Sequence, residues 1–327
     1  MKFKPQYKLD LIKESEYNEK MQEITELFDK CSNKGFLESF DGTKLNYEYF
    51  LCENATASVI IVHGFTEFIK KFYEMAYYFL NMGYNVFLYD QRGHGYSDRK
   101  VENTELTHVD DFEDYVCDLE CFVDRVVSPA SEGKPIYMFA HSMGGSVATL
   151  YLTRCGDKIA KTVLSAPMVE PCAHNIPRFV LNHYIKSCAK KESWDSDFPH
   201  FGKFDPNASF EKSSDSSYNR FKSNLDMRIN DLNYRNSTST YSWMYQSINI
   251  CDRILVRKKL KQIKSKVLMF SAGRDTVVKI RPQLKLARRI PGCVLERVPE
   301  AKHSIYTGEP ETLLNFYNKT FAFLAEN

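Results

Sequence analysis

The amino-acid sequence predicts an α/β fold built on a doubly wound, mostly parallel sheet. Two observations carry this prediction. Short apolar runs alternate with helical patterns along most of the chain, and a stretch rich in aromatic and polar residues interrupts the alternation between residues 168 and 250. Strands that alternate with helices are typical of a parallel sheet covered on both faces. The interruption indicates a segment inserted into the sheet-forming domain.

The N-terminal residues precede this alternation. Residues 1–34 mix Lys with Asp and Glu, and their apolar residues have partly helical spacing, which predicts a helical arm docked on the surface. Two alternating runs, 36–40 and 44–50, then flank Asp41-Gly42. This dipeptide between two such runs is typical of a β-hairpin.

The elements of the core follow in order. Strands are expected at 58–62, 85–89, 135–140, 161–165, 266–270 and 294–298, and helices at 70–82, 108–127, 142–154, 281–290 and 310–325. We therefore assign residues 1–34 to the arm and residues 168–250 to an inserted, mainly helical cap. Residues 35–167 and 251–327 form one core domain.

The composition narrows the classes of partner. The chain has 327 residues, 43% of them hydrophobic, and its 44 basic and 42 acidic residues leave a formal net charge of +2. This balance removes the strongest electrostatic reason to expect nucleic acid as a partner. The sequence has neither a run of about 18 apolar residues nor a signal-peptide pattern, so we expect a cytoplasmic protein. Nine cysteines without CxxC spacing predict buried, reduced thiols and no metal site or disulfide framework.

The most informative segment surrounds Ser142, where a predicted strand ends and a helix begins. A serine on such a sharp turn exposes its hydroxyl at the sheet edge, beside backbone N–H groups that can stabilise an oxyanion. The turn needs small residues two positions away on each side. Gly144 supplies one, and Ala140 replaces the glycine of the common G-x-S-x-G pattern with one extra methyl group. We predict that Ser142 is a nucleophile; the alternative is an ordinary helix start rich in small residues.

A serine nucleophile needs a base, and the base needs an orienting acid. Asp275 follows the strand predicted at 266–270, and His303 follows the strand predicted at 294–298, so both lie at carboxyl ends of strands, as Ser142 does. Glu170 is the best alternative acid. The other seven histidines flank early glycine turns or lie on a predicted helix or in the insertion, which disfavours them as the base: His63, His94, His108, His141, His174, His183 and His200.

The donors to the oxyanion are expected at the backbone N–H groups of Phe65 and Met143. Met143 follows the nucleophile, and Phe65 lies in the loop after the strand at 58–62, beside the serine turn in this architecture. Gly64 permits the turn of that loop. His63 is expected to be a structural hydrogen-bonding residue there instead of a base.

These motifs, taken in order, resemble the signatures of α/β-hydrolases. The matching segments are His63-Gly64, Asp90 to Ser97, Ala140 to Gly145, Gly273 to Asp275 and Ala301 to His303. Their combination is similar to the lysophospholipase and monoacylglycerol lipase group, over about residues 36–167 and 266–325. The resemblance implies an α/β-hydrolase fold, serine hydrolysis without a cofactor, and a cap over Ser142.

The composition of the insertion allows it to hold an acyl chain. Apolar residues recur near helical spacing between 176 and 185, and Trp and Tyr side chains add amphipathic surface. We predict substrate contacts at Phe179, Tyr184 and Trp243 of the cap, and at His63 and Gly64 of the core. The alternative is that the cap side chains only pack onto the core.

The predicted function is a serine carboxylic-ester hydrolase that acts, by resemblance, on lysophospholipids or monoacylglycerols. The alternatives are a small-ester or thioester hydrolase with the same triad, a prolyl peptidase, or a catalytically silent binding protein. A basic run after the cap is expected to be either a solvated helix face or a peripheral contact with an anionic membrane, at about 1 kcal/mol per cation. This run comprises Arg253, Arg257, Lys258, Lys259, Lys261, Lys264 and Lys266.

Overall fold

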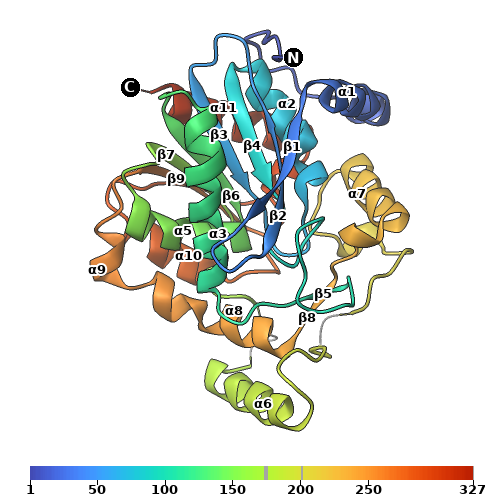
Figure 1. Cartoon of the computed structure of the whole chain (residues 1–327), viewed down its shortest axis with the longest axis vertical. Coiled ribbons are helices and arrows are strands. Elements are labelled where there is room, and N and C mark those ends of the chain that lie inside the picture. Colours follow the sequence, from blue (N-terminus) through green and yellow to red (C-terminus); the bar gives the residue numbers. More distant parts are fainter. Residues whose placement is uncertain (173–175, 200–201, 327) are drawn as a thin grey trace.

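The structure is a computed structural model that describes residues 1–172, 176–199 and 202–326. These residues form an eight-stranded sheet in the order β1-β2-β4-β3-β6-β7-β9-β10 (Figure 1). The hairpin of β1 (Asn33–Glu38) and β2 (Lys44–Phe50) lies at one edge, and β2 pairs antiparallel with β4. All other pairs of neighbours in this sheet are parallel. The predicted α/β fold, with its N-terminal hairpin and mostly parallel sheet, is confirmed.

The parallel strands lie within two residues of their predicted bounds. Continuous apolar runs mark strands that are buried on both faces, and this signal is strong enough to fix their positions. The strands are β3 Ala57–Val62, β4 Tyr84–Tyr89, β6 Ile136–His141, β7 Lys161–Ser165, β9 Lys266–Ala272 and β10 Val294–Val298.

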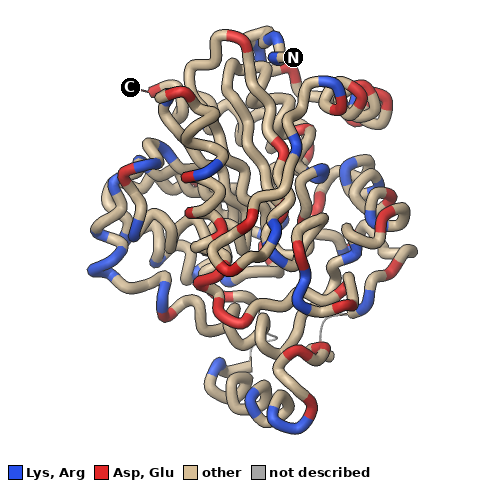
Figure 2. The backbone as a smooth tube through the Cα atoms, in the orientation of Figure 1, with Lys and Arg blue, Asp and Glu red and all other residues tan. Residues whose placement is uncertain are grey.

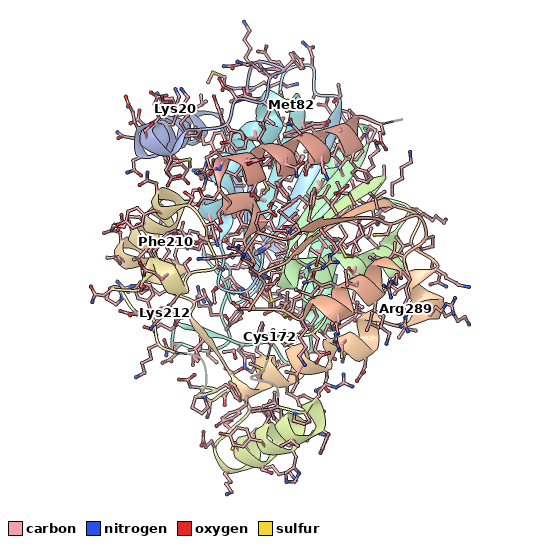
Figure 3. All side chains as sticks on the ribbon, turned by 180° about the vertical axis from the view of Figure 1, so that it is seen from behind. Lys20, Met82, Cys172, Phe210, Lys212 and Arg289 are labelled. Atoms are coloured by element: carbon pink, nitrogen blue, oxygen red, sulfur yellow. The ribbon has the colours of Figure 1, made fainter. Side chains whose placement is uncertain are left out.

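Side chains from the two faces of the sheet form two hydrophobic layers, because successive residues of a strand point in opposite directions. In β3, Ile60 belongs to the layer packed against α3, α5 and α10, and Ile61 to the layer packed against α1, α2 and α11. Figure 1 shows α3 and α5 in front of the sheet, and the reversed view of Figure 3 shows the opposite face. The helices are α1 Tyr17–Cys31, α2 Tyr73–Asn81, α3 Glu113–Phe122, α5 Met143–Cys155, α10 Ile280–Ala287 and α11 Pro310–Ala325.

Two predicted helical segments begin later than the sequence indicates. In the arm, residues before Glu14 are not helical, and Phe3 forms an isolated β-bridge with Cys52. The helix expected from residue 108 begins at Glu113, and β5 (Leu106–Thr107) precedes it, paired in parallel with β8 (Thr238–Ser239). Both differences arise from backbone pairing with residues distant in the sequence, which local periodicity does not encode.

The segment predicted as a cap contains α6 (Arg178–Lys191), α7 (Tyr218–Asn230) and most of α8 (Tyr241–Ile254), so the predicted boundary at residue 250 falls inside α8. α6 packs on α8 through buried apolar residues and through Asn182, whose amide nitrogen is 2.8 Å from Oδ1 of Asn249. Figure 1 shows α6 beyond α8, on the side where the parallel strands end. The division into arm, core and cap stays a prediction.

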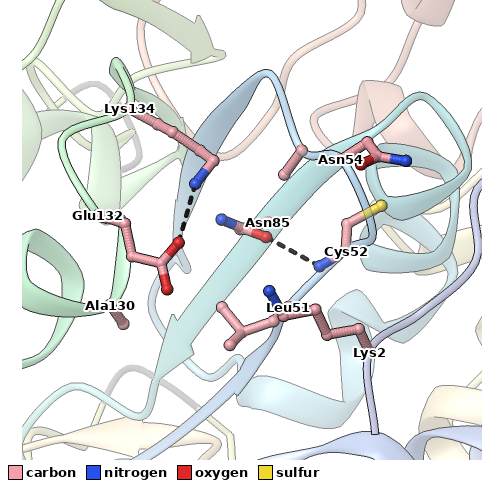
Figure 4. Close-up of a pocket in the computed structure, with 9 residues that line it drawn as sticks. Lys2, Leu51, Cys52, Asn54, Asn85, Ala130, Glu132 and Lys134 are labelled. Atoms are coloured by element: carbon pink, nitrogen blue, oxygen red, sulfur yellow. Dashed lines mark hydrogen bonds and ion pairs between the residues drawn. The ribbon is translucent and has the colours of Figure 1, made fainter.

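A polar cavity of about 290 Å³ lies at the amino ends of the parallel strands, beside the first residues of β3, β4 and β6 (Figure 4). Asn85 Oδ1 accepts a hydrogen bond from the backbone N–H of Cys52 at 2.8 Å, and Lys134 pairs with Glu132 at 3.2 Å. The cavity is remote from the carboxyl ends of the strands, where Ser142 lies.

Arg220 of α7 joins the arm to the core through charges with little solvent contact. Its side chain is 4% exposed and contacts both carboxylate oxygens of Glu74 in α2, at 2.5 and 2.9 Å. Glu14 of the arm lies 3.1 Å from the same guanidinium, which also covers the ring of Tyr17. The arm is therefore fixed to α7 and to α2 by one cation.

Removal of this cation should destabilise the protein strongly. Arg220→Ala leaves the Glu74 carboxylate buried without its partner, so we expect a loss of about 3–5 kcal/mol in the free energy of unfolding, measured by urea denaturation. Lys222→Ala on the same helix breaks only an exposed pair with Asp226 and should cost less than about 1 kcal/mol. Equal losses of stability in the two variants would contradict a stabilising role of Arg220.

Candidate active site

Ser142 occupies a strained turn between β6 and α5. Its φ is +50° and its ψ is −119°, a conformation that costs a residue other than glycine about 1–3 kcal/mol. Neighbouring segments hold the turn. The N–H of Ser142 donates to the carbonyl of Ser165 at 3.1 Å, and the carbonyl of Ser142 accepts from the N–H groups of Gly145 and Met168, each at 2.9 Å.

The small residues around this turn have different roles. A Cβ atom on Gly144 would lie 2.3 Å from the carbonyl oxygen of Val62 and 2.5 Å from that of His63, so α5 approaches the end of β3 only with glycine there. Ala140 is fully buried inside β6, where the structure accommodates its methyl group. The departure from the G-x-S-x-G pattern therefore leaves the turn intact.

The structure brings Ser142, His303 and Asp275 together from the ends of three strands. His303 Nε2 is 2.9 Å from Ser142 Oγ, and His303 Nδ1 is 2.8 Å from Asp275 Oδ2. The Ser142 and His303 residues are 6% and 5% exposed. This geometry is that of a nucleophile, a base and an orienting carboxylate. Glu170, the alternative acid, instead contacts Lys279 at 2.5 Å.

The surroundings of Asp275 keep it ionised. Burial acts to raise the pKa of this carboxyl group, but the hydrogen bond and charge of His303 and the N–H groups of Val278 and Val277 lower it below its usual value. Asp275 Oδ1 accepts from those two N–H groups at 2.9 Å each. The acid is thus oriented by the backbone on one side and faces the histidine on the other.

The residues predicted to supply oxyanion donors lie on the two segments that flank the serine. Met143 is the first residue of α5, where backbone N–H groups lack partners within the helix. Phe65 lies in the loop after β3, and a Cβ atom on the adjacent Gly64 would be 3.0 Å from the Cβ of Ser142. This loop is therefore packed directly on the serine turn.

A cavity of about 370 Å³ opens at Ser142 between the core and α6. Among the residues of the predicted site, Phe65, Tyr184 and Trp243 line it, and the ring of Trp243 stacks on that of Phe65 with centroids 4.0 Å apart. Most other lining residues are apolar and come from five separate segments of the described chain. They are Met168, Pro171, Cys172, Ile176, Val180, Leu181, Phe198, Met244, Val277 and Val278.

Three of the predicted substrate contacts are not among the described residues that line this cavity. Phe179 is 77% exposed on the outer side of α6. His63 is buried and bridges two turns, since its Nδ1 is 2.8 Å from the carbonyl of Gly64 and its Nε2 accepts from the N–H of Gln91 at 2.9 Å. Burial lowers the pKa of His63, which favours this neutral, structural role. Gly64 packs behind Phe65, against Ser142.

The sequence also missed residues that tertiary structure brings to the site. Cys172, predicted as a buried thiol, is exposed and lines the cavity between the core and α6 (Figure 3). Glu67 lies four residues after His63 and contacts His141, the residue before the nucleophile. Its closeness to the His63-Gly64 motif is the one sequence signal that marks it. His174 and His200, two of the disfavoured histidines, lie outside the described residues.

The described part of the chain contains no cluster of three or more His, Cys, Asp or Glu residues with the arrangement of a metal site. Within the same residues, no helix has both the length and the apolar character that crossing a membrane requires.

Comparison with known proteins assigns the family. The model of the family described as serine aminopeptidase, S33, matches residues 53–311. The chain belongs to this family. The S33 family chain is 26% identical over 275 residues to the probable lysophospholipase L2 of Haemophilus influenzae, covering 83% of this chain and 85% of that protein. Over a shorter stretch of 142 residues it is 34% identical to the monoglyceride lipase of Saccharomyces cerevisiae, covering 40% and 43% of the two chains.

Solved structures agree with this assignment at the level of the fold. The S33 family chain superposes on a soluble variant of the Saccharomyces cerevisiae monoglyceride lipase with a TM-score of 0.71 at 20% identity, over 89% of this chain and 94% of that one. A thermostable carboxyl esterase from Bacillus coagulans gives a TM-score of 0.71 at 16% identity, over 90% and 98%. The protein is a serine hydrolase of the α/β-hydrolase superfamily.

Proposed function

We propose that this protein is a carboxylic-ester hydrolase of single-chain lipids, lysophospholipids or monoacylglycerols, that acts through Ser142, His303 and Asp275. The observation that carries the proposal is the hydrogen-bonded series of these three side chains at one end of an apolar cavity. The relatives named lysophospholipase and monoglyceride lipase support the same class of substrate.

The geometry supports an acyl-enzyme mechanism. His303 Nε2 takes the proton of Ser142 as Oγ attacks the ester carbonyl, and the N–H groups of Phe65 and Met143 stabilise the oxyanion that forms. The ester C–O bond then breaks, and His303 returns the proton to the leaving alcohol. Water repeats the sequence on the acyl-enzyme, with His303 again as base, to release the fatty acid and free Ser142.

The shape and chemistry of the cavity favour one acyl chain. Its volume of about 370 Å³ lies near the lower end of the range of about 300–1,000 Å³ for small-molecule sites. No Asp or Glu is among its described lining residues. A peptidase that binds a free amino terminus needs an anionic partner for the buried ammonium group. The lining therefore favours an acyl chain over the amino-terminal residue of a peptide.

Covalent labelling tests the triad. The protein should form a stable adduct with a fluorophosphonate probe, and Ser142→Ala should form none. Asp275→Asn should lower kcat by about 10⁴-fold, because an orienting carboxylate of this kind holds the histidine in its working tautomer. Glu170→Gln, which removes only the partner of Lys279, is the matched control and should keep full labelling. Equal labelling of Ser142→Ala would overturn the proposal.

An acyl-length series tests the substrate class. For glycerol esters, kcat/KM should rise from butyryl to palmitoyl chains, since longer chains bury more apolar surface at about 0.8 kcal/mol per methylene. Val180→Trp, which narrows the cavity, should reduce kcat/KM for long chains more than for short ones. The adjacent Phe179→Trp lies outside the cavity and should leave the profile unchanged. A maximum at butyryl esters would replace the lipid proposal by a small-ester hydrolase.

A second part of the proposal concerns where the protein meets its lipid. The basic run is partly neutralised, because Arg253 pairs with Asp111 at 2.5 Å and Lys264 with Asp157 at 2.6 Å. Exposed apolar side chains instead gather on α6 at Phe179, Val180 and Tyr184, and the latter two reach the cavity.

Basic residues accompany this apolar surface. Figure 2 shows Lys and Arg along α6. They are Lys186, Lys190 and Lys191, and Arg178, which pairs with Asp252 at 2.9 Å. An apolar helix face with cations beside it suits the surface of an anionic membrane. We therefore propose peripheral contact through α6, so that a lipid passes from the membrane to Ser142 along the apolar lining.

Vesicle co-sedimentation distinguishes the two surfaces. Phe179→Ser should weaken binding to phosphatidylserine vesicles by about 10- to 100-fold, because it removes an aromatic side chain worth about 1.5–3 kcal/mol when buried. Lys258→Glu in the basic run is the matched comparison and should have a smaller effect. If only Lys258→Glu weakens binding, the basic run and not α6 is the contact.

A further inference from the structure

Three segments of the site meet at one buried carboxylate, that of Glu67, which is 4% exposed. Its Oε2 accepts from the backbone N–H of Gly64 at 2.5 Å and lies 2.9 Å from Nδ1 of His141. Its Oε1 accepts from Lys71 Nζ at 2.9 Å and from the hydroxyl of Tyr306 at 2.5 Å. All four donors point at one residue that the triad chemistry does not use.

Three of the four partners of Glu67 lie within three residues of a group that acts in the proposed reaction. Gly64 precedes Phe65 in the loop that would stabilise the oxyanion, His141 precedes Ser142, and Tyr306 follows His303 by three residues. The carboxylate therefore joins the oxyanion loop, the nucleophile turn and the histidine loop. No other described side chain has hydrogen bonds to all three.

The Gly64 loop is held between Glu67 and the nucleophile. A Cβ atom on Gly64 would lie 2.9 Å from Glu67 Oε2 and 3.0 Å from Ser142 Cβ, so the loop fits this gap only without a side chain. The hydrogen bond from Gly64 N–H fixes the first peptide of the loop. The orientation of the next peptide, which carries the N–H of Phe65, depends on it.

The charge of Glu67 is retained despite burial. Burial acts to raise the pKa of this carboxyl group, but His141 and Lys71, together with the hydrogen bonds from His141 and Tyr306, hold it well below its usual value. An ionised carboxylate accepts stronger hydrogen bonds than a neutral amide does. A glutamine at position 67 also places an NH₂ group against at least one of the four donors.

His141 lies between Glu67 and the proposed base, His303, and contacts both. Its Nδ1 must donate to the carboxylate, and its ring centroid is 4.8 Å from that of His303 and 5.0 Å from that of Tyr306. Its Nε2 is buried and has no hydrogen-bond partner among the described residues. The bond to Glu67 is thus the polar contact that sets the orientation of this ring beside His303.

We propose that Glu67 is a positioning residue for hydrolysis, which holds the oxyanion loop, the nucleophile turn and the histidine loop in their working arrangement without touching the substrate. The inference rests on the proposed function of Ser142, His303 and Asp275. It adds that a fourth side chain, outside the triad, sets the rate of the acylation step.

Glu67→Gln tests this role. In folded protein we expect kcat to fall by about 10- to 100-fold, the size of effect that a displacement of about 1 Å in a catalytic site produces, with KM changed less than about twofold. The rate of fluorophosphonate labelling should fall in parallel. Tyr306→Phe removes a single hydroxyl group, so it should fold even if Glu67→Gln does not, and it should lower kcat in the same direction by a smaller factor.

Glu74→Gln is the matched control. Glu74 is also a buried carboxylate of this region that contacts a cation, Arg220, and a tyrosine hydroxyl, that of Tyr78, but it has no contact with the triad. It should lose stability while the folded protein keeps its kcat. A kcat loss in Glu74→Gln equal to that in Glu67→Gln would overturn the inference, as would a wild-type kcat in Glu67→Gln or Tyr306→Phe. If the wild-type protein itself fails to label at Ser142, the proposed function fails instead.

Discussion

The backbone of Ser142 adopts a conformation that a residue other than glycine avoids, and the rest of the site depends on the contacts that enforce it. The end of β7 accepts the N–H of Ser142, and the segment after β7 donates to its carbonyl. Gly144 lets α5 start against β3. The parallel strands therefore fix the serine hydroxyl group at their carboxyl ends. There the loop that carries His303 can contact it.

The segment predicted as an insertion is hydrogen-bonded to the loop that carries His303. Thr307 Oγ1 donates to Asp215 Oδ1 at 2.7 Å, and the N–H of Ser304 donates to the carbonyl of Ser214 at 3.2 Å. Ser217, which lies next to this segment, accepts a hydrogen bond from the backbone N–H of Arg220 in α7. Its hydroxyl group donates to the Glu14 carboxylate of the arm. Polar contacts therefore connect the arm, the predicted insertion and the loop that carries His303. α6 is not part of this set, and its apolar side chains Phe179, Val180 and Tyr184 lie at the surface.

Chemistry and specificity come from different parts of this molecule. The three residues of the proposed triad lie at the ends of strands whose positions the sheet fixes. The cavity wall instead comes largely from the inserted segment, at residues such as Val180, Leu181 and Met244.

The sequence by itself determined the alternation of strands and helices and the order Ser142, Asp275, His303, because buried strands are continuous apolar runs and nucleophile turns need small neighbours. It placed Tyr184 and Trp243 at the cavity but also Phe179, which is on the outer side of the same helix. Only the tertiary structure decided which side chains face Ser142, that β5 pairs with β8, and that Glu67 joins three loops. Those contacts bring together residues up to 239 positions apart, and no local periodicity carries information about such distant partners.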